Sequence, residues 1–429
     1  MKKNCCKKTK TMLYYPGSNK KFQIFKQTEG IQMIEITNLR QGAILNSTHG
    51  EETETSLTIP VEGISETGHP VVINGMAAEM EGRRFSLQLP LTEKINSIKA
   101  QTVTPHGVFS QELTVVWDKK SFKRYNFYID DHSFLFTDLA KERPVSAFDH
   151  FYLKALKEIH RKYGLKLTLN AFYENAHHGF ELKDMPDTWK SEFIDNSDWL
   201  KFSFHSKSEF PDRPYAEASA EDIGREWDMV QNEICRFAGE ESYITPVVFH
   251  WASIHPAAAQ EAIKRGLTCY SRGFRLRVMG GPSLADRQQG GNMQLVEKRA
   301  LSGEDRSSGT LEYQLHYDIA EEDSYLKKHF AYYDPFLQVY FFQHIHCCNL
   351  IPLDKTREKI ETALTVAEKY GTHALACGSH EQYSFPYYPN YLPDHLERLE
   401  LTAKVMAEHG YHPVFFPQGV MGNPAWDIK

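Results

Sequence analysis

No stretch of this 429-residue sequence is apolar over the roughly 18 or more residues that a membrane-spanning helix needs. The opening residues, MKKNCCKKTK, are charged, and no apolar segment of the kind found in a secretory signal peptide follows them. We therefore expect no membrane partner and a cytoplasmic protein. The alternative is a secreted protein whose signal is missing from this sequence.

Clustered positive charge is lacking beyond the first ten residues, and the formal net charge is −7. Because nucleic-acid binding depends on clustered Lys and Arg, we expect no nucleic-acid partner. Cysteine is also sparse. Its seven residues are odd in number and show no CxxC spacing, so the sequence predicts neither a disulfide framework nor a thiolate zinc site.

Hydrophobic residues, in contrast, make up 41% of the chain, and the length suits two or three domains. Residues 1–20 form a basic, flexible tail in this interpretation. From Phe22 to about Asp118, short alternating stretches such as Arg84–Leu89 are separated by turn residues. Alternation with a period of two at this spacing predicts a β-sandwich over residues 21–120, serving more readily as a packing module than in sugar binding.

The pattern changes after Lys123, where apolar strands alternate with amphipathic helices. The helices are expected at Ala147–Tyr163, Ala220–Phe237, Pro256–Arg265, Lys355–Tyr370 and Leu392–His409. The strands are expected at Tyr125–Ile129, Leu165–Phe172, Leu200–Phe204, Thr245–Phe249, Leu267–Tyr270, Leu311–Tyr317, Leu337–Phe342, His373–Ala376 and His412–Phe416. This order predicts an α/β fold over residues 121–429, a (β/α) barrel of seven to eight strands. Residues 274–310 are expected to form a long loop.

Charged groups and imidazoles follow the expected strands, where a barrel keeps its chemistry. They are Asp130 and Asp131, Glu174, His205, His250, Arg272, His316 and Asp318, His344 and His346, and His380 and Glu381. One such histidine is usually structural. A series of strand ends that all carry such groups predicts a functional site.

Two of these segments resemble motifs of the polysaccharide deacetylase (NodB-like) family. Tyr128–His132 resembles the first motif, a strand running into Asp-Asp, and Phe204–Glu209 resembles the second, His-Ser/Thr-x-x-His. In the preceding sandwich, Val72–Gly75, Phe85–Leu87 and Asn96–Ile98 resemble the Ig-like modules that accompany carbohydrate enzymes. For site residues, the resemblance to the deacetylase family implies that Asp130 is the general base, that Asp131 and His205 bind a divalent metal, and that His380 is the general acid. The metal expected is zinc, with nickel, cobalt or manganese as alternatives.

The sequence departs from these motifs at two points. Glu209 replaces the second histidine, so the third metal ligand is expected to be Glu209 first and His250 second. Val248–Trp251 replaces the Arg-Pro-Pro run of the third motif, and we expect Arg272 to take over the role of orienting the base.

The resemblance implies hydrolysis of an N- or O-acyl group on a carbohydrate. Further residues are expected at the substrate, with aromatic faces for stacking on the sugar. They are Trp251, Glu174, His344, His346, Glu381 and Tyr383. His344 and His346 lie two apart, so both are expected on the same face of their strand.

Two other functions stay open. Asp130 and Asp131 with Glu174 are also the carboxylates that a metal-independent glycoside hydrolase or a lyase would use. A barrel that binds carbohydrate without catalysis is the third hypothesis.

Overall fold

The structure is a computed structural model that describes residues 12–13, 22–23, 33–216, 218–252, 254–271 and 319–427. Two short strands, β1 (Met12–Leu13) and β2 (Phe22–Gln23), pair antiparallel near the N-terminus. Apart from these strands, the predicted tail at 1–20 lies outside the described residues. So do the predicted strand Leu311–Tyr317, the predicted loop 274–310 and Arg272, His316 and Asp318.

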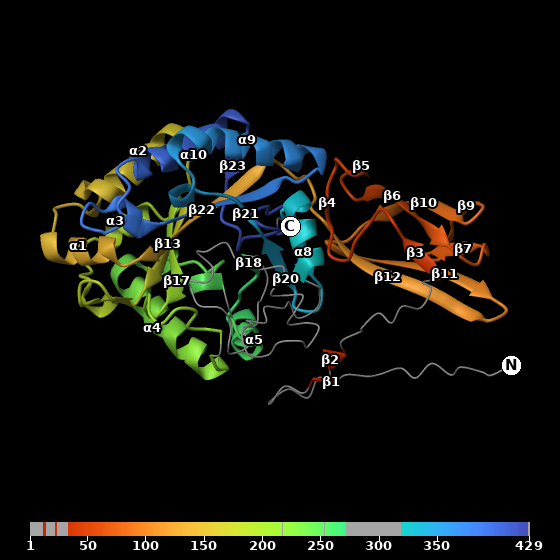
Figure 1. Ribbon diagram of the computed structural model, residues 1–429, viewed down its shortest axis with the longest axis horizontal. Coiled ribbons are helices and arrows are strands. Elements are labelled where there is room, and N and C mark those ends of the chain that lie inside the picture. The colour runs from red at the N-terminus through yellow and green to blue at the C-terminus, as the bar shows by residue number, and fades with distance from the viewer. Residues whose placement is uncertain are drawn as a thin grey trace.

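The N-terminal part consists of two antiparallel-rich sheets that pack face to face (Figure 1). One sheet has the order β3-β6-β10-β9, with β5 also paired to β6; the bounds are β3 (Ile34–Ile36), β5 (Glu51–Glu52), β6 (Leu57–Ser65), β9 (Glu79–Glu81) and β10 (Arg84–Leu91). The other has the order β4-β12-β11-β7-β8, with bounds β4 (Ile44–Leu45), β7 (Val71–Ile73), β8 (Met76–Ala77), β11 (Ile95–Thr104) and β12 (Gly107–Trp117).

Alternation along these strands explains their packing. In β6, Leu57, Ile59 and Val61 are buried, and the residues between them are more exposed. The buried set meets Ile98 and Val115 of the opposite sheet in one core. The strands and their alternation are confirmed, and the Ig-like identity of the sandwich stays a prediction.

The larger part is built on a parallel sheet with the order β17-β14-β13-β22-β21, to which β23 adds by pairing with the start of β13. Its bounds are β13 (Arg124–His132), β14 (Leu167–Phe172), β17 (Leu200–Ser206), β21 (His344–Cys347), β22 (Ala374–His380) and β23 (His412–Pro413). Residues of β13 alternate between two faces. Tyr125, Phe127 and Ile129 pack in the core shared with the helices, whereas Tyr128 packs in a separate cluster.

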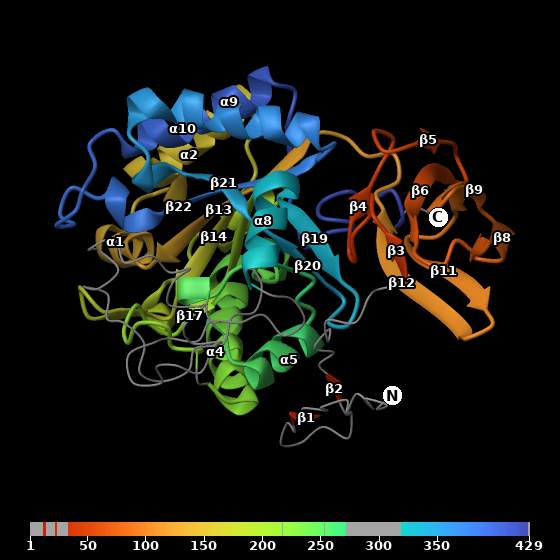
Figure 2. The same ribbon diagram turned by 45° about the vertical axis from the view of Figure 1, so that its right-hand side comes forward.

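Helices cover the outer face of this sheet. In Figures 1 and 2, α2, α9 and α10 lie side by side over β13 and β22, and α4 runs beside β17. The helical bounds are α1 (Phe134–Glu142), α2 (Phe151–Tyr163), α3 (Lys190–Asp195), α4 (Ala220–Ala238), α5 (Pro256–Lys264), α8 (Ile319–His329), α9 (Leu353–Lys369) and α10 (His395–Glu408). The shorter elements are η1 (Ala147–Asp149), η2 (Leu182–Asp184), η3 (Glu240–Ser242), η4 (His250–Ala252), η5 (Cys348–Leu350), η6 (Glu381–Ser384), β15 (Glu174–Asn175) and β16 (Phe180–Glu181).

Among the described residues, no helix combines the length and apolarity needed to cross a membrane.

The predicted strand Thr245–Phe249 is wrong. This segment is irregular, because Pro246 has no N–H to donate to a ladder. It still joins its neighbours: Ile244 N donates to Phe202 O of β17 at 2.9 Å, and Ser271 N of β18 (Cys269–Ser271) donates to Val247 O at 2.7 Å.

A separate sheet has the order β18-β20-β19, with β19 (Ala331–Asp334) antiparallel to β20 (Val339–Phe342). The segment Ile244–Val247 therefore bridges the two sheets between β17 and β18. No sheet among the described strands closes on itself, and the barrel stays a prediction.

The sandwich is joined to the larger part by buried polar and aromatic contacts. Arg124, at the start of β13, forms a buried ion pair with Asp118 at 2.9 Å and donates to the backbone of Val420 and Met421. Trp426 packs edge-on against Trp117, with 5.1 Å between the ring centroids. Figure 2 shows β4 beside β19, where Tyr333 N donates to Gly42 O at 2.8 Å. A side chain at Gly42 would collide with the Tyr333 carbonyl, so glycine permits this approach.

Candidate metal centre

The end of β13 carries the two consecutive aspartates. In a regular strand, neighbouring side chains point to opposite faces. The pairing of β13 with β14 shifts register between Ile129 and His132, and Asp131 has a left-handed φ of 67°. This break in the alternation brings both carboxylates toward one imidazole: Asp130 Oδ1 lies 3.8 Å from His205 Nδ1, and Asp131 Oδ1 lies 3.1 Å from His205 Nε2.

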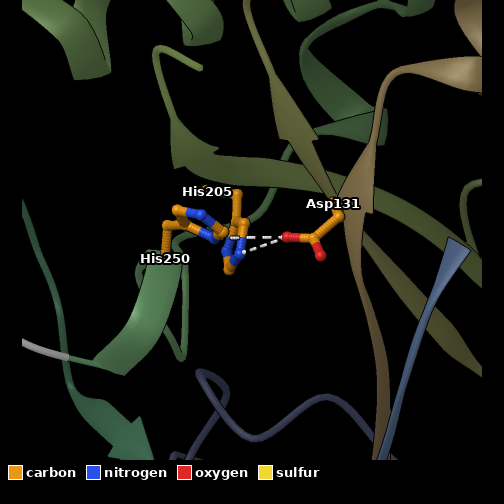
Figure 3. Close-up of side chains that lie close together, drawn as sticks. All are labelled: Asp131, His205 and His250. Carbon is orange, nitrogen blue, oxygen red and sulfur yellow. Dashed lines mark ion pairs between the residues drawn. The ribbon is translucent and has the colours of Figure 1, made fainter. Parts of the chain in front are cut away.

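Asp131, His205 and His250 form a buried cluster whose ligand atoms all lie within 4.8 Å of one another (Figure 3). His205 comes from the end of β17, and His250 is the first residue of η4, directly after the irregular segment that ends at Phe249. His250 Nδ1 lies 3.3 Å from Asp131 Oδ1. After His250, Trp251 and Ala252 both have positive φ values, 65° and 50°. Strained backbone of this kind in non-glycine residues is often found at functional sites.

Backbone carbonyls determine which ring nitrogen of each histidine carries a proton. His205 Nδ1 lies 3.3 Å from Val248 O, and His250 Nε2 lies 2.9 Å from Glu209 O. A carbonyl oxygen only accepts, so both of these nitrogens donate. In the neutral imidazoles, the lone pairs are then on His205 Nε2 and His250 Nδ1, the atoms that face Asp131.

A hydrogen bond also orients the Asp131 carboxylate, through the oxygen that does not face the histidines. Gln382 Nε2 donates to Asp131 Oδ2 at 3.1 Å, whereas Oδ1 is buried without a hydrogen bond of its own. Three atoms with lone pairs therefore converge on one point: Asp131 Oδ1, His205 Nε2 and His250 Nδ1. Such a donor set, oriented from behind by other groups, fits a divalent cation such as zinc.

The electrostatics of the two aspartates differ. Burial favours a raised pKa for both. At Asp131, the close contacts with the His205 and His250 rings and the charge of His380 outweigh burial and lower the pKa well below its usual range. At Asp130, burial and the neighbouring Asp131 charge raise the pKa well above its usual range, against a hydrogen bond from Asn170 at 2.6 Å. Burial lowers the pKa of His205 despite its contact with Asp131.

Glu209, the residue expected first as third ligand, is not in the cluster. Its carboxylate Oε2 lies 2.6 Å from His177 Nε2, and only its backbone oxygen reaches the site, through His250. The residue expected second, His250, lies there instead. It begins η4, in which Trp251 has non-helical dihedral angles, so its approach to Asp131 does not come from a regular strand end.

His380 lies at the end of β22, paired in register with Asp130. Its Nδ1 lies 3.0 Å from Asn349 Oδ1 and 4.0 Å from Cys347 Sγ. With Nδ1 donating to the amide oxygen, Nε2 is the ring atom left for chemistry. The structure thus brings Asp130, Asp131, His205, His250 and His380 to the same end of the sheet.

His344 and His346 do not share a face as expected. A register shift in β21 pairs them with the adjacent residues Ala376 and Cys377, which point to opposite sides of β22. His344 contacts the Tyr128 hydroxyl at 3.1 Å. His346 is buried, and its charged neighbours Lys359 and Arg398 belong to α9 and α10.

The remaining expected substrate residues occupy different surroundings. Glu381 is fully buried and accepts three backbone N–H groups at the start of α1. Glu174 pairs with Lys207 at 3.0 Å. Trp251 is 40% exposed beside His250, with 5.9 Å between the ring centroids, and Tyr383 lies 6.4 Å from the His380 ring. Arg272 is outside the described residues.

Three amides at the site went unnoticed in the sequence: Asn170, Asn349 and Gln382. Asn170 carried a signal, because it is an amide within the mostly apolar strand Leu167–Phe172 and a buried polar residue needs a partner. Gln382 and Asn349 carried none, since their role depends on contacts between distant segments.

The chain matches no protein-family model and no curated protein sequence. Among solved structures, two β-glucuronidase structures from Bacteroides uniformis, one of them a calcium-binding mutant, match with TM-scores of 0.16 and identities of 11% and 10%, covering 21% of this chain and 11% of theirs. A candidate α-galactosidase from Bacteroides fragilis matches with a TM-score of 0.15 and 12% identity, covering 54% of this chain and 48% of that one. The chain therefore spans about half or less of these proteins, and similarities this low carry no argument about fold or function.

Proposed function

We propose that this protein is a metal-dependent hydrolase that removes an N- or O-acyl group from a carbohydrate, as a divergent member of the polysaccharide deacetylase family. The observation that carries the proposal is the convergence of Asp131 Oδ1, His205 Nε2 and His250 Nδ1. Each of these side chains is oriented by a hydrogen bond at its other polar atom. A carboxylate and two imidazoles with room for a further ligand are typical of catalytic zinc sites.

The resemblance to the deacetylase motifs supports the reaction type. Asp131 and His205 are at the motif positions that bind metal, and His250 takes the place of the second motif histidine. A bound divalent cation supplies an activated water and polarises the acyl carbonyl. The family resemblance and the exposed ring of Trp251 beside His250 support a carbohydrate substrate.

The remaining groups have complementary roles in the proposed reaction. Asn170 Nδ2 donates a hydrogen bond to Asp130 Oδ1. The other oxygen, Oδ2, would accept the proton of the attacking water. The water oxygen bonds to the acyl carbon, and the bond from that carbon to the sugar nitrogen or oxygen breaks. His380 Nε2 donates a proton to the departing atom, while Asn349 holds the imidazole through Nδ1.

The test combines metal content with deacylation. Protein purified without chelator and supplied with zinc, nickel, cobalt or manganese is analysed for bound metal, and acetate release from N- and O-acetylated oligosaccharides is measured. Asp131→Ala should lower the metal content by one equivalent per chain and abolish acetate release. His380→Ala should keep the metal and lower turnover by roughly two to four orders of magnitude.

His346→Ala serves as the matched control for His380→Ala, because its ring faces the helices; we expect a smaller effect on turnover. A wild-type protein that binds none of these metals would exclude the deacetylase proposal. The metal-independent glycoside hydrolase would then be the better hypothesis, although Glu174 pairs with Lys207 in this structure.

A further inference from the structure

A second group of potential metal ligands lies away from the site described above. Asp138 and Glu142 are one turn apart on α1 and therefore share a face of that helix. His150 lies between η1 and α2, in an extended conformation with ψ 133°. One ligand atom from each of the three residues lies within 4.8 Å of the other two.

His150 is the unusual member of this group. Its side chain is 1% exposed, and neither ring nitrogen has a hydrogen-bond partner. Phe151 and Phe385 lie against it, with ring-centroid distances of 4.8 Å and 6.1 Å. A buried polar atom without a partner is destabilising, so this ring has a reason to take a ligand. Its Nε2 points toward the carboxylates, 3.6 Å from Asp138 Oδ2.

In the described part of the chain, the basic side chain that pairs with these carboxylates is His150. Neither Asp138 nor Glu142 forms an ion pair with a lysine or arginine there. Asp138 is instead oriented by Tyr387, whose hydroxyl donates to Oδ2 at 2.9 Å. This is the same oxygen that faces His150 Nε2, and a hydrogen bond that fixes a carboxylate is common at metal sites.

We propose that Asp138, Glu142 and His150 bind a divalent transition-metal cation, with Zn²⁺ as the probe. One imidazole and two carboxylates suit zinc better than magnesium or calcium, which prefer oxygen ligands alone. The cation would link the last turn of α1 to the start of α2 and stabilise the folded chain through binding to it alone. This site is independent of the proposed deacylation.

The rival explanation is a protonated His150 that forms a simple ion pair with Asp138. The two explanations differ in what Glu142 does. A metal site needs this exposed carboxylate, whereas an ion pair between His150 and Asp138 does not. Glu142 is also exposed at the end of α1, so replacing it should not prevent folding.

The experiment is a calorimetric titration of the chelator-treated full chain with Zn²⁺. The Asp131→Ala background removes the first site, and Asp131→Asn repeats the test if the alanine variant is poorly folded. In either background we expect one equivalent of Zn²⁺ and a rise in Tm with Zn²⁺. Adding Glu142→Gln should weaken this binding on the order of 10- to 100-fold. Glu397→Gln, an exposed change on α10, should leave it unchanged.

Two outcomes would overturn the second site. One is a folded Asp131 variant that takes up no Zn²⁺; the other is Zn²⁺ binding that Glu142→Gln does not alter. Neither outcome bears on the first site, which is tested by the metal that Asp131→Ala removes from the wild-type protein.

Discussion

At Asp131 the alternation of β13 is interrupted, and the left-handed φ of this residue gives it a direction that no regular strand position offers. The adjacent Asp130 keeps the direction expected from the strand. Two neighbouring carboxylates thus face one imidazole, and their pKa values shift in opposite directions: burial and the Asp131 charge raise the pKa of Asp130, whereas the contacts with His205 and His250 lower the pKa of Asp131. Separate roles for the two aspartates follow from this difference.

The identity of the third ligand can be tested with two substitutions. His250→Ala should weaken metal binding on the order of tenfold or more, because it removes Nδ1 from the cluster. Glu209→Gln should leave affinity nearly unchanged, because that carboxylate faces His177. Calorimetry with Zn²⁺ in a Glu142→Gln background isolates this site. Loss of binding in Glu209→Gln, with retention in His250→Ala, would restore the ligand set expected from the motif.

His346 gives a prediction about pH. Burial and the charges of Lys359 and Arg398 lower its pKa to about 4. In the unfolded chain the pKa is about 6.5, so between these values the unfolded state binds more protons and stability falls as the pH is lowered. The loss from this residue amounts to roughly 3 kcal/mol. Denaturant unfolding from pH 7 to pH 4 should show a shallower loss for His346→Phe than for the wild type.

In the His346→Phe variant, other buried histidines still make the stability fall as the pH is lowered. Burial lowers the pKa of His132 to about 3 and that of His395 to about 3. The comparison therefore concerns only the difference between the two proteins. Equal pH slopes would mean that His346 is not a neutral buried group.

Among the elements, α1 depends on a residue far away in sequence. Glu381 accepts from Ser133 N and Phe134 N at 2.8 and 2.9 Å, and from Leu135 N at 2.7 Å. These amides have no partner within the helix, and the positive end of the helix dipole favours an acceptor there. Glu381→Gln places an NH₂ group against an N–H donor and should cost about 1–3 kcal/mol.

Thermal unfolding with zinc absent measures this cost. Glu397→Gln, an exposed change on α10, serves as control and should shift Tm little. An unchanged Tm for Glu381→Gln would show that the cap adds nothing to stability.

Most regular elements were predictable because their periodicity is strong. α4 was expected at Ala220–Phe237 and spans Ala220–Ala238, and α5 was expected at Pro256–Arg265 and spans Pro256–Lys264. α2 begins at Phe151, not Ala147, because His150 is extended and separates it from η1. The same residue that shortens this helix is the one that faces Asp138.

Irregular backbone limited the prediction of the site. Asp131 and His205 follow strands, so their approach could be inferred from parallel strand ends. The contribution of His250 depends on a segment without strand structure and on two left-handed residues after it. Likewise, the opposite directions of His344 and His346 follow from a register shift that a period of two does not reveal.

For the whole molecule, the link between sandwich and α/β part is strong enough to affect folding. Asp118 and Arg124 are 2% and 0% exposed, and Asn423 donates to Asp118 at 2.7 Å. Removing one partner leaves a buried charge, so Asp118→Ala should cost about 3–5 kcal/mol. A fragment beginning at Ser121 would lack Asp118 and should be destabilised for the same reason.

Denaturant unfolding followed by tryptophan fluorescence measures this effect, because Trp117 and Trp426 lie at the junction. The matched control is Glu66→Ala, which breaks the exposed ion pair with Arg83 and should change stability by about 1 kcal/mol or less. A fragment from Ser121 as stable as the full chain would establish two independently folding domains.

The irregular segment from Ile244 to His250 has a kinetic consequence for the proposed cation. It contacts β17 and β18 through isolated hydrogen bonds, not a continuous ladder, and segments held in this way open locally more often than core strands. When it opens, His250 moves with it, and the cation loses a ligand in the same event. The rate at which metal leaves the protein would then report how often this segment opens, and amide exchange at Ala252 would slow in step with metal retention.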